Sequence, residues 1–139
     1  MISTKKVTLV VSSLGGGGAE AICVNIANHL SESGWQVDLI VLNLKKEVHF
    51  EFISKKINLV ILSVDQARYS FFPLIRYFFK KKVKTCLVFS HEMAVVIIIL
   101  RIIFRLDIKI ISRNISILSI KINELKNKGI WKKFFVRFL

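Results

Sequence analysis

The stretch that decides the fold is residues 6–20, KVTLVVSSLGGGGAE, in which an apolar run leads into four consecutive glycines. Residues 6–13 are rich in β-branched side chains and end in two serines, a pattern typical of a strand buried on both faces. Beyond the glycines, apolar residues recur at helical spacing as far as Leu30, and Ser33-Gly34 supplies a stop signal. The stretch therefore predicts a strand, a glycine turn and an amphipathic helix.

The rest of the chain continues this alternation. Short apolar runs bounded by polar or turn residues predict four further strands, at residues 36–43, 57–63, 85–90 and 108–112. Helices are predicted from about residue 73 to 82, from 93 to 105, and in a basic tail from 120 to 139. Alternation of this kind predicts an α/β fold, a Rossmann-like three-layer sandwich with a mostly parallel sheet.

The composition limits the class of protein. A chain of 139 residues suits one domain, and 53% hydrophobic residues can build a core, which excludes global disorder. Cys23 and Cys86 have no paired spacing, so a disulfide framework and a cysteine zinc site are excluded. The most apolar run, residues 93–100, is too short to cross a bilayer, and no signal peptide precedes the first strand. We therefore expect a cytoplasmic protein.

The glycine turn is compatible with several functions. Gly16, Gly18 and Ala21 match the G-x-G-x-x-G/A spacing of dinucleotide-binding turns, in which a backbone without Cβ comes close to phosphate oxygens. However, the second strand ends at Asn43 instead of an acidic residue that would hold a ribose. The turn also lacks the Gly-Lys-Ser/Thr of nucleoside triphosphatases. Another kind of phosphate binding and a purely structural turn both stay open.

Three pieces of sequence, in order, carry a resemblance to a known family. Residues 13–20 (SLGGGGAE) resemble the start of the retaining glycosyltransferases of the GT-B fold, family four type, where a Gly-Gly-Ala-Glu turn opens the first helix. Residues 89–92 (FSHE) and 111–114 (ISRN) each follow a predicted strand and fit the same family. The resemblance covers residues 6 to about 119. It implies that residues 1–139 are an N-terminal Rossmann-like domain of a GT-B enzyme, apparently truncated, with the C-terminal donor-binding domain absent.

The resemblance also implies a site at the carboxyl ends of the strands. Gly17 and Gly18 would approach the diphosphate of a nucleotide-sugar donor, and His91 would be the catalytic group. No metal and no cofactor are implied. From the residues alone, His91 and Glu92 are also compatible with a capping pair before the next helix.

Three further residues would contact substrate by the same resemblance: Glu92, Arg113 and Asn114. Relatives often carry His or Glu near position 113, and an arginine there suits holding anionic oxygens better than acting as a base. The other two histidines, His29 and His49, are expected at the surface, and no histidine pair has metal-ligand spacing.

The implied activity is that of a hexosyltransferase in cell-surface glycan biosynthesis. It would transfer a sugar from a nucleotide-sugar donor to a lipid-linked or saccharide acceptor, with retention of configuration. Since a complete enzyme of this type needs a second Rossmann-like domain, we expect the chain to be inactive alone. The alternative is a noncatalytic, membrane-associated partner subunit of a split glycosyltransferase, completed by a separate C-terminal half.

The net charge of +13 is unevenly distributed. Two clusters, residues 68–84 and 121–137, interleave basic residues with aromatics, which predicts peripheral contact with the inner face of the cell membrane. A solvated basic face is the equal alternative. Nucleic-acid binding ranks below both, and no nucleic-acid partner is expected, because no helix-turn-helix, RNA-binding aromatic signature or zinc finger accompanies the charge.

Overall fold

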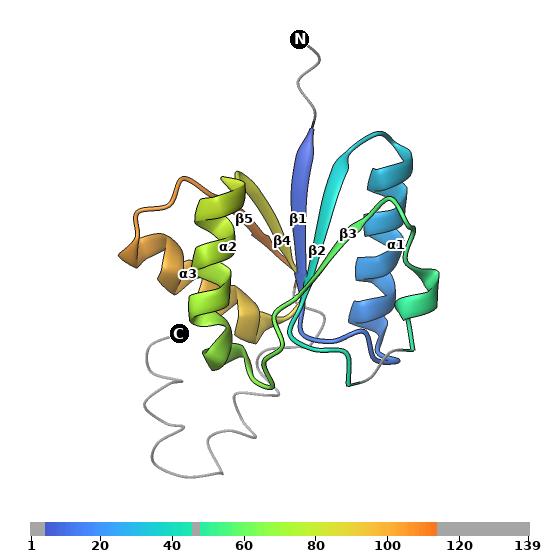
Figure 1. The fold of residues 1–139 in the computed structure, drawn as a ribbon, viewed down its shortest axis with the longest axis horizontal. Coiled ribbons are helices and arrows are strands. Elements are labelled where there is room, and N and C mark those ends of the chain that lie inside the picture. The colour runs from blue at the N-terminus through green and yellow to red at the C-terminus, as the bar shows by residue number, and fades with distance from the viewer. Residues whose placement is uncertain (1–4, 46–47, 114–139) are drawn as a thin grey trace.

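The computed structural model describes residues 5–45 and 48–113 and shows an α/β fold (Figure 1). Within these residues, every predicted strand and helix is present, in the predicted order. The elements are β1 (Lys6–Val11), α1 (Gly18–Glu32), β2 (Gln36–Val41), β3 (Asn58–Ile61), α2 (Phe71–Lys81), β4 (Thr85–Val88), α3 (His91–Ile103) and β5 (Lys109–Ser112). The predicted helix at 120–139 and the second basic cluster lie outside the described residues.

The five strands form one sheet in the order β3-β2-β1-β4-β5, and every pairing is parallel. Leu9 of β1 lies opposite Leu39 of β2 on one side and Leu87 of β4 on the other. From β1 the sequence first adds strands in one direction and then, after β3, in the other. The boundary between β1 and β4 is therefore the point at which the strand order reverses.

Helices cover both faces of the sheet, which makes the three layers (Figure 1). Successive residues of a strand point to opposite faces. Leu9 of β1 accordingly packs in one cluster with Cys23 of α1, whereas Val10 packs in another with Leu74 of α2 and Ile97 of α3. All five side chains are fully buried. The predicted sandwich of a parallel sheet between two helical layers is confirmed.

Two helices begin earlier than predicted. α2 begins at Phe71, so Pro73 lies within its first turn, where the missing N–H has no helical partner to lose. α3 begins at His91 instead of residue 93, because Ser90 has the extended backbone of an N-cap, with φ −125° and ψ 133°. His91 and Glu92 are therefore in the first turn of α3.

A buried polar cluster holds α2 on the sheet, near the amino ends of the strands. Asp38 of β2 is 6% exposed and accepts hydrogen bonds from the Tyr77 hydroxyl of α2 and from Asn58 Nδ2 of β3, the latter at 2.8 Å. Lys6 Nζ lies 3.2 Å from the same carboxylate. Burial raises the pKa of Asp38, but these hydrogen bonds and the lysine outweigh it and hold the pKa below its ordinary value.

Candidate functional site

The candidate site lies at the carboxyl ends of β1 and β4. Phe89 N–H donates to the carbonyl of Val10 at 2.9 Å, so the two chain segments stay paired one residue beyond the end of β4. α1 begins at Gly18 and α3 at His91. Two helix amino termini, one from each helical layer, therefore start at one edge of neighbouring strands. Open α/β sheets bind ligands in the crevice at such a reversal point.

The glycine turn presents bare backbone at this edge. Gly15 is buried, whereas Gly16, Gly17 and Gly18 are exposed. Gly17 is the N-cap of α1, and no side chain makes a capping hydrogen bond to the first turn. The first amides of a helix have no partner within the helix. They are therefore available to an anion, which the helix dipole also favours.

The two glycines assigned to the diphosphate differ in how much room a side chain would have at each position. A Cβ at Gly18 would meet no atom within 4 Å, so the fold does not require glycine there, and glycine within a helix costs about 1 kcal/mol relative to alanine. What the glycine leaves is open access to the main chain. A Cβ at Gly17 would lie 2.3 Å from Glu20 Oε2, so this side chain would have to move.

The Glu20 carboxylate lies beside the glycine turn. Ser13 Oγ donates to Glu20 Oε1 at 3.3 Å, and the carboxylate faces Gly17 from the first turn of α1. A carboxylate in this position complements the positive end of the helix dipole. An incoming anion would have to compete with it for the same electrostatic field.

A buried hydroxyl without a hydrogen-bond partner lies at the same edge of the sheet. Ser90 Oγ, at the N-cap of α3, is buried and has no hydrogen-bond partner in the described part of the chain. Unpaired buried polar atoms are rare and costly in folded proteins, so such an atom needs an explanation. His91 follows it and is partly buried, whereas Glu92 is exposed.

The position of His49 differs from the sequence prediction. The sequence predicts it at the surface, but it is partly buried, and its Nε2 is the second buried polar atom without a partner among the described residues. Its backbone N–H donates to the carbonyl of Leu14 at 3.0 Å, which attaches this segment to the residue before the glycines. Val48 lies next to Gly16. The segment has no hydrophobic periodicity, so no pattern could have placed His49 there. His29 is exposed, as predicted.

The remaining predicted residues are more distant or lie outside the described part. Arg113 is exposed, and its N–H donates to the carbonyl of Val88 at 2.9 Å, which places it at the same edge. It follows β5, two strands from β1, and hence about 10 Å along the sheet. Asn114 lies outside the described residues. The structure thus places the glycine turn, Ser90 and His91 at one edge of the sheet, after the neighbouring strands β1 and β4, with Arg113 farther along the edge.

Other kinds of site find little support in residues 5–45 and 48–113. No group of three or more His, Cys, Asp or Glu in this part could hold a metal ion. Cys23 and Cys86 are buried, and burial raises the pKa of the Cys86 thiol to about 12, which disfavours the nucleophilic thiolate. None of the helices in these two segments combines the length and the apolar character needed to cross a membrane.

Comparison with known proteins does not assign the chain to a family. No protein-family model matches it, and no curated protein matches it.

Proposed function

We propose that the chain is the N-terminal, acceptor-side part of a retaining glycosyltransferase of the GT-B type, and that its glycine turn contacts the diphosphate of a nucleotide-sugar donor. The observation that supports this is the exposed backbone of Gly16–Gly18, without a side-chain cap, at the reversal point of the sheet, where the buried Ser90 hydroxyl also has no partner among the described residues. Both features supply hydrogen-bond donors at the same edge of the sheet. Phosphoryl oxygens are strong acceptors that such donors suit.

Each residue of the edge has a role in this proposal. The amides at Gly17 and Gly18 would bind phosphoryl oxygens of the donor, and Ser90 Oγ would donate to another oxygen of it. His91, in the first turn of α3, would hydrogen-bond a hydroxyl of the transferred sugar. Arg113, about 10 Å farther along the edge, would hold anionic oxygens of a lipid-linked or saccharide acceptor.

The proposal is tested by calorimetric titration of the full chain with uridine and guanosine diphosphates and with pyrophosphate. Gly18→Ala is the decisive variant, because its methyl group fits the fold and yet stands over the exposed backbone. We expect at least about tenfold weaker binding, since the methyl group hinders the close approach of a phosphate to the main chain that glycine allows. Asn25→Ala, at an exposed position of α1, is the matched control and should bind like the wild type.

Two further results would distinguish a turn that binds diphosphate from a turn that is purely structural. Glu20→Gln removes a negative charge beside the turn and should strengthen diphosphate binding several-fold. If neither the wild type nor Glu20→Gln binds any diphosphate, the turn is structural and the proposal fails. Equal binding by wild type and Gly18→Ala would also contradict it, because the ligand would then bind elsewhere.

Catalysis is a separate question. A retaining enzyme of this type closes its site with a second domain, so residues 1–139 should show no sugar transfer from any of a panel of nucleotide sugars. Measurable transfer by the isolated chain, to saccharide or lipid-linked acceptors, would refute this expectation.

A further inference from the structure

A second surface, distant from the glycine turn, consists of exposed apolar side chains on α2 and α3. We define this α2–α3 surface by Phe72, Phe79, Ile102, Ile103 and Phe104, whose exposed fractions are 78%, 57%, 70%, 59% and 40%. Exposed apolar residues scattered singly are normal, but a continuous patch of them marks an interaction site. These residues therefore indicate an interaction site only if they form one continuous patch.

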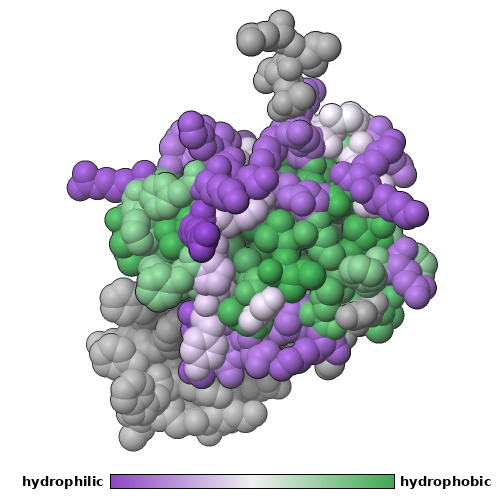
Figure 2. Space-filling view, in the orientation of Figure 1, coloured by the Kyte–Doolittle hydropathy of each residue, from purple (hydrophilic) through white to green (hydrophobic). Residues whose placement is uncertain are grey.

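Aromatic contacts join the phenylalanines of α2 to Phe104 at the end of α3. The Phe104 ring lies 6.0 Å from that of Phe79 and 6.2 Å from that of Phe71, and Phe71 in turn lies 5.7 Å from Phe72. Ile102 and Ile103 directly precede Phe104 at the end of α3. On the left flank of Figure 2, where α2 and α3 lie, hydrophobic side chains reach the surface beside hydrophilic ones.

The charges around the patch have one sign. Residues 67–84 contain six basic residues and no acidic one, and Arg101 and Arg105 lie at the end of α3. Of these eight, only Lys84 is paired with an acidic residue in the described part of the chain, with Asp107 at 2.8 Å. On α2, the exposed residues Phe72, Arg76 and Phe79 recur at helical spacing, so basic and aromatic side chains share one face.

Charge argues against two candidates for covering the patch. A second copy of the chain would bring the same unpaired basic residues against their own kind. Residues 114–139 contain six basic residues and one acidic residue, so this segment would also meet like charge. Nucleic acid would match the charge, but its binding gives no role to exposed aliphatic side chains such as Ile102 and Ile103.

We infer that the α2–α3 surface docks on a bilayer that contains anionic lipid. The basic side chains would lie at the headgroups, and the aromatic and aliphatic side chains would enter the boundary between headgroups and acyl chains. This docking accounts for both kinds of side chain. The basic residues attract the protein to the membrane, and the apolar patch is removed from water. This docking does not depend on the function proposed for the glycine turn.

Flotation of the full chain with lipid vesicles tests the inference. One set is phosphatidylcholine alone, and in the other about a third of the lipid is phosphatidylglycerol, which supplies the negative surface. We expect at least about tenfold stronger binding to the anionic vesicles, and release at high salt, because screening weakens the attraction. This comparison needs only the wild type, so it does not depend on how any variant folds.

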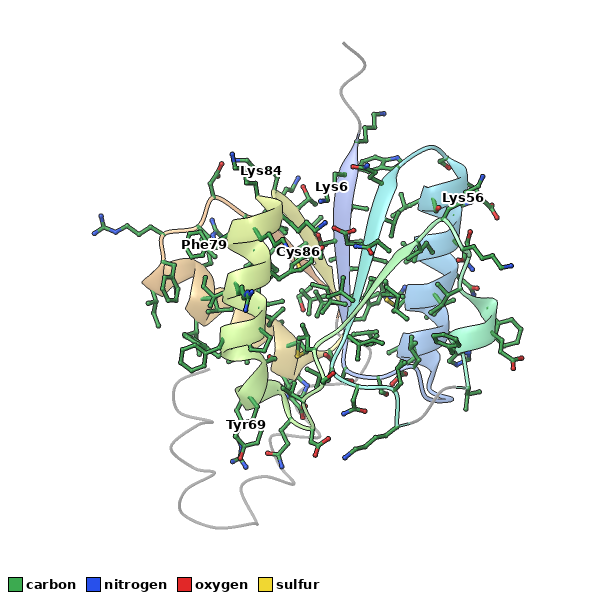
Figure 3. All side chains as sticks on the ribbon, in the orientation of Figure 1. Lys6, Lys56, Tyr69, Phe79, Lys84 and Cys86 are labelled. Carbon is green, nitrogen blue, oxygen red and sulfur yellow. The ribbon has the colours of Figure 1, made fainter. Side chains whose placement is uncertain are left out.

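Paired variants locate the surface. Phe72→Ser with Ile102→Ser removes apolar side chains that are mostly exposed, so the core is unaffected. Phe52→Ser with Ile61→Ser is the matched control, because both side chains are apolar and exposed, at 66% and 43%, and the net charge is unchanged; Lys56, which lies between them in the sequence, is on the α1 side, opposite to Phe79 in Figure 3. The first pair should lose binding about tenfold or more, and the control pair should retain it.

Three outcomes would overturn the inference. The first is that the wild type binds neither kind of vesicle. The second is that the control pair loses as much binding as the α2–α3 pair, which would indicate that binding is not specific to the α2–α3 surface. The third is that nucleic acid of the same charge density competes the protein fully off the vesicles while the Phe72→Ser, Ile102→Ser pair binds that nucleic acid unchanged.

Discussion

The two ends of the sheet differ in whether their buried polar groups are hydrogen-bonded within the described residues. Near the amino ends of the strands, Asp38 is buried with Tyr77 and also accepts from the exposed Asn58, so each of these polar side chains has a partner. At the carboxyl ends, Ser90 Oγ is buried and has no partner among residues 5–45 and 48–113, and the first turn of α1 has no side-chain cap. Satisfied buried polar groups fix a structure, whereas unsatisfied ones cost stability. Under the proposed function, one end contributes stability and the other end binds the ligand.

The largest effect is expected at the stable end. Asp38→Ala leaves the Tyr77 hydroxyl and the Asn58 amide without their acceptor beneath α2, and should lower the free energy of unfolding by about 3 kcal/mol. Tyr77→Phe removes one donor only and should cost about 1 kcal/mol. Urea denaturation followed by circular dichroism measures both. A loss below about 0.5 kcal/mol for Asp38→Ala would show that the cluster does not hold α2.

Low pH should reduce the stability that the polar cluster around Asp38 provides. The pKa of Asp38 is lowered in the folded state, so its contribution is complete above the unfolded value of about 3.9 and is lost as the pH falls through the lower folded pKa. Denaturation midpoints should therefore drop below about pH 4 in the wild type, and less steeply in Asp38→Asn. Asp107→Asn is the control: its pKa is also lowered, by Lys84, but that pair is exposed and its removal should matter little. Equal slopes in wild type and Asp38→Asn would contradict the assignment.

A truncation at the carboxyl ends of the strands should change the free energy of unfolding in the opposite direction. Ser90→Ala removes a buried hydroxyl that has no partner in the described part of the chain, so the free energy of unfolding should stay unchanged or rise by up to about 1 kcal/mol. Diphosphate binding should weaken. A clear loss of stability would mean that the hydroxyl has a partner in the folded protein, and the contrast between the two ends would disappear.

The smallest effect is expected at the glycine turn. Gly18→Ala places a methyl group in open space at the start of α1 and should raise the free energy of unfolding by about 0.5 kcal/mol, because alanine loses less backbone freedom than glycine. Thermal melting of this variant and of the wild type gives the difference. A destabilised Gly18→Ala would indicate that the fold itself requires the glycine.

The fold could be predicted from the sequence because its signals are local. The β-branched run at residues 6–13 and the periodic apolar residues after it have few alternatives to a strand and a helix. Helix boundaries were less accurate. The start of α2 was placed at Pro73 because proline favours the first turn, but proline is tolerated anywhere in that turn, and the helix begins at Phe71.

The candidate site was predictable only in part. Gly18 and His91 follow strands, and parallel strands bring their carboxyl ends to one edge, so their common location could be derived. The unpaired atoms of Ser90 and His49 could not be, because burial of a single polar atom depends on packing between distant segments. The polar cluster at Asp38 was missed for the same reason, since Tyr77 is 39 residues away in the sequence.

The central claim is that the backbone of the glycine turn meets phosphoryl oxygens at the edge shared with Ser90 and His91. It is tested most directly by following backbone amide resonances of ¹⁵N-labelled protein during titration with a nucleoside diphosphate. We expect saturable shifts concentrated at Gly16–Gly18 and at Ser90 and His91. Shifts confined to the basic residues of α2, or the absence of saturable shifts, would contradict the claim.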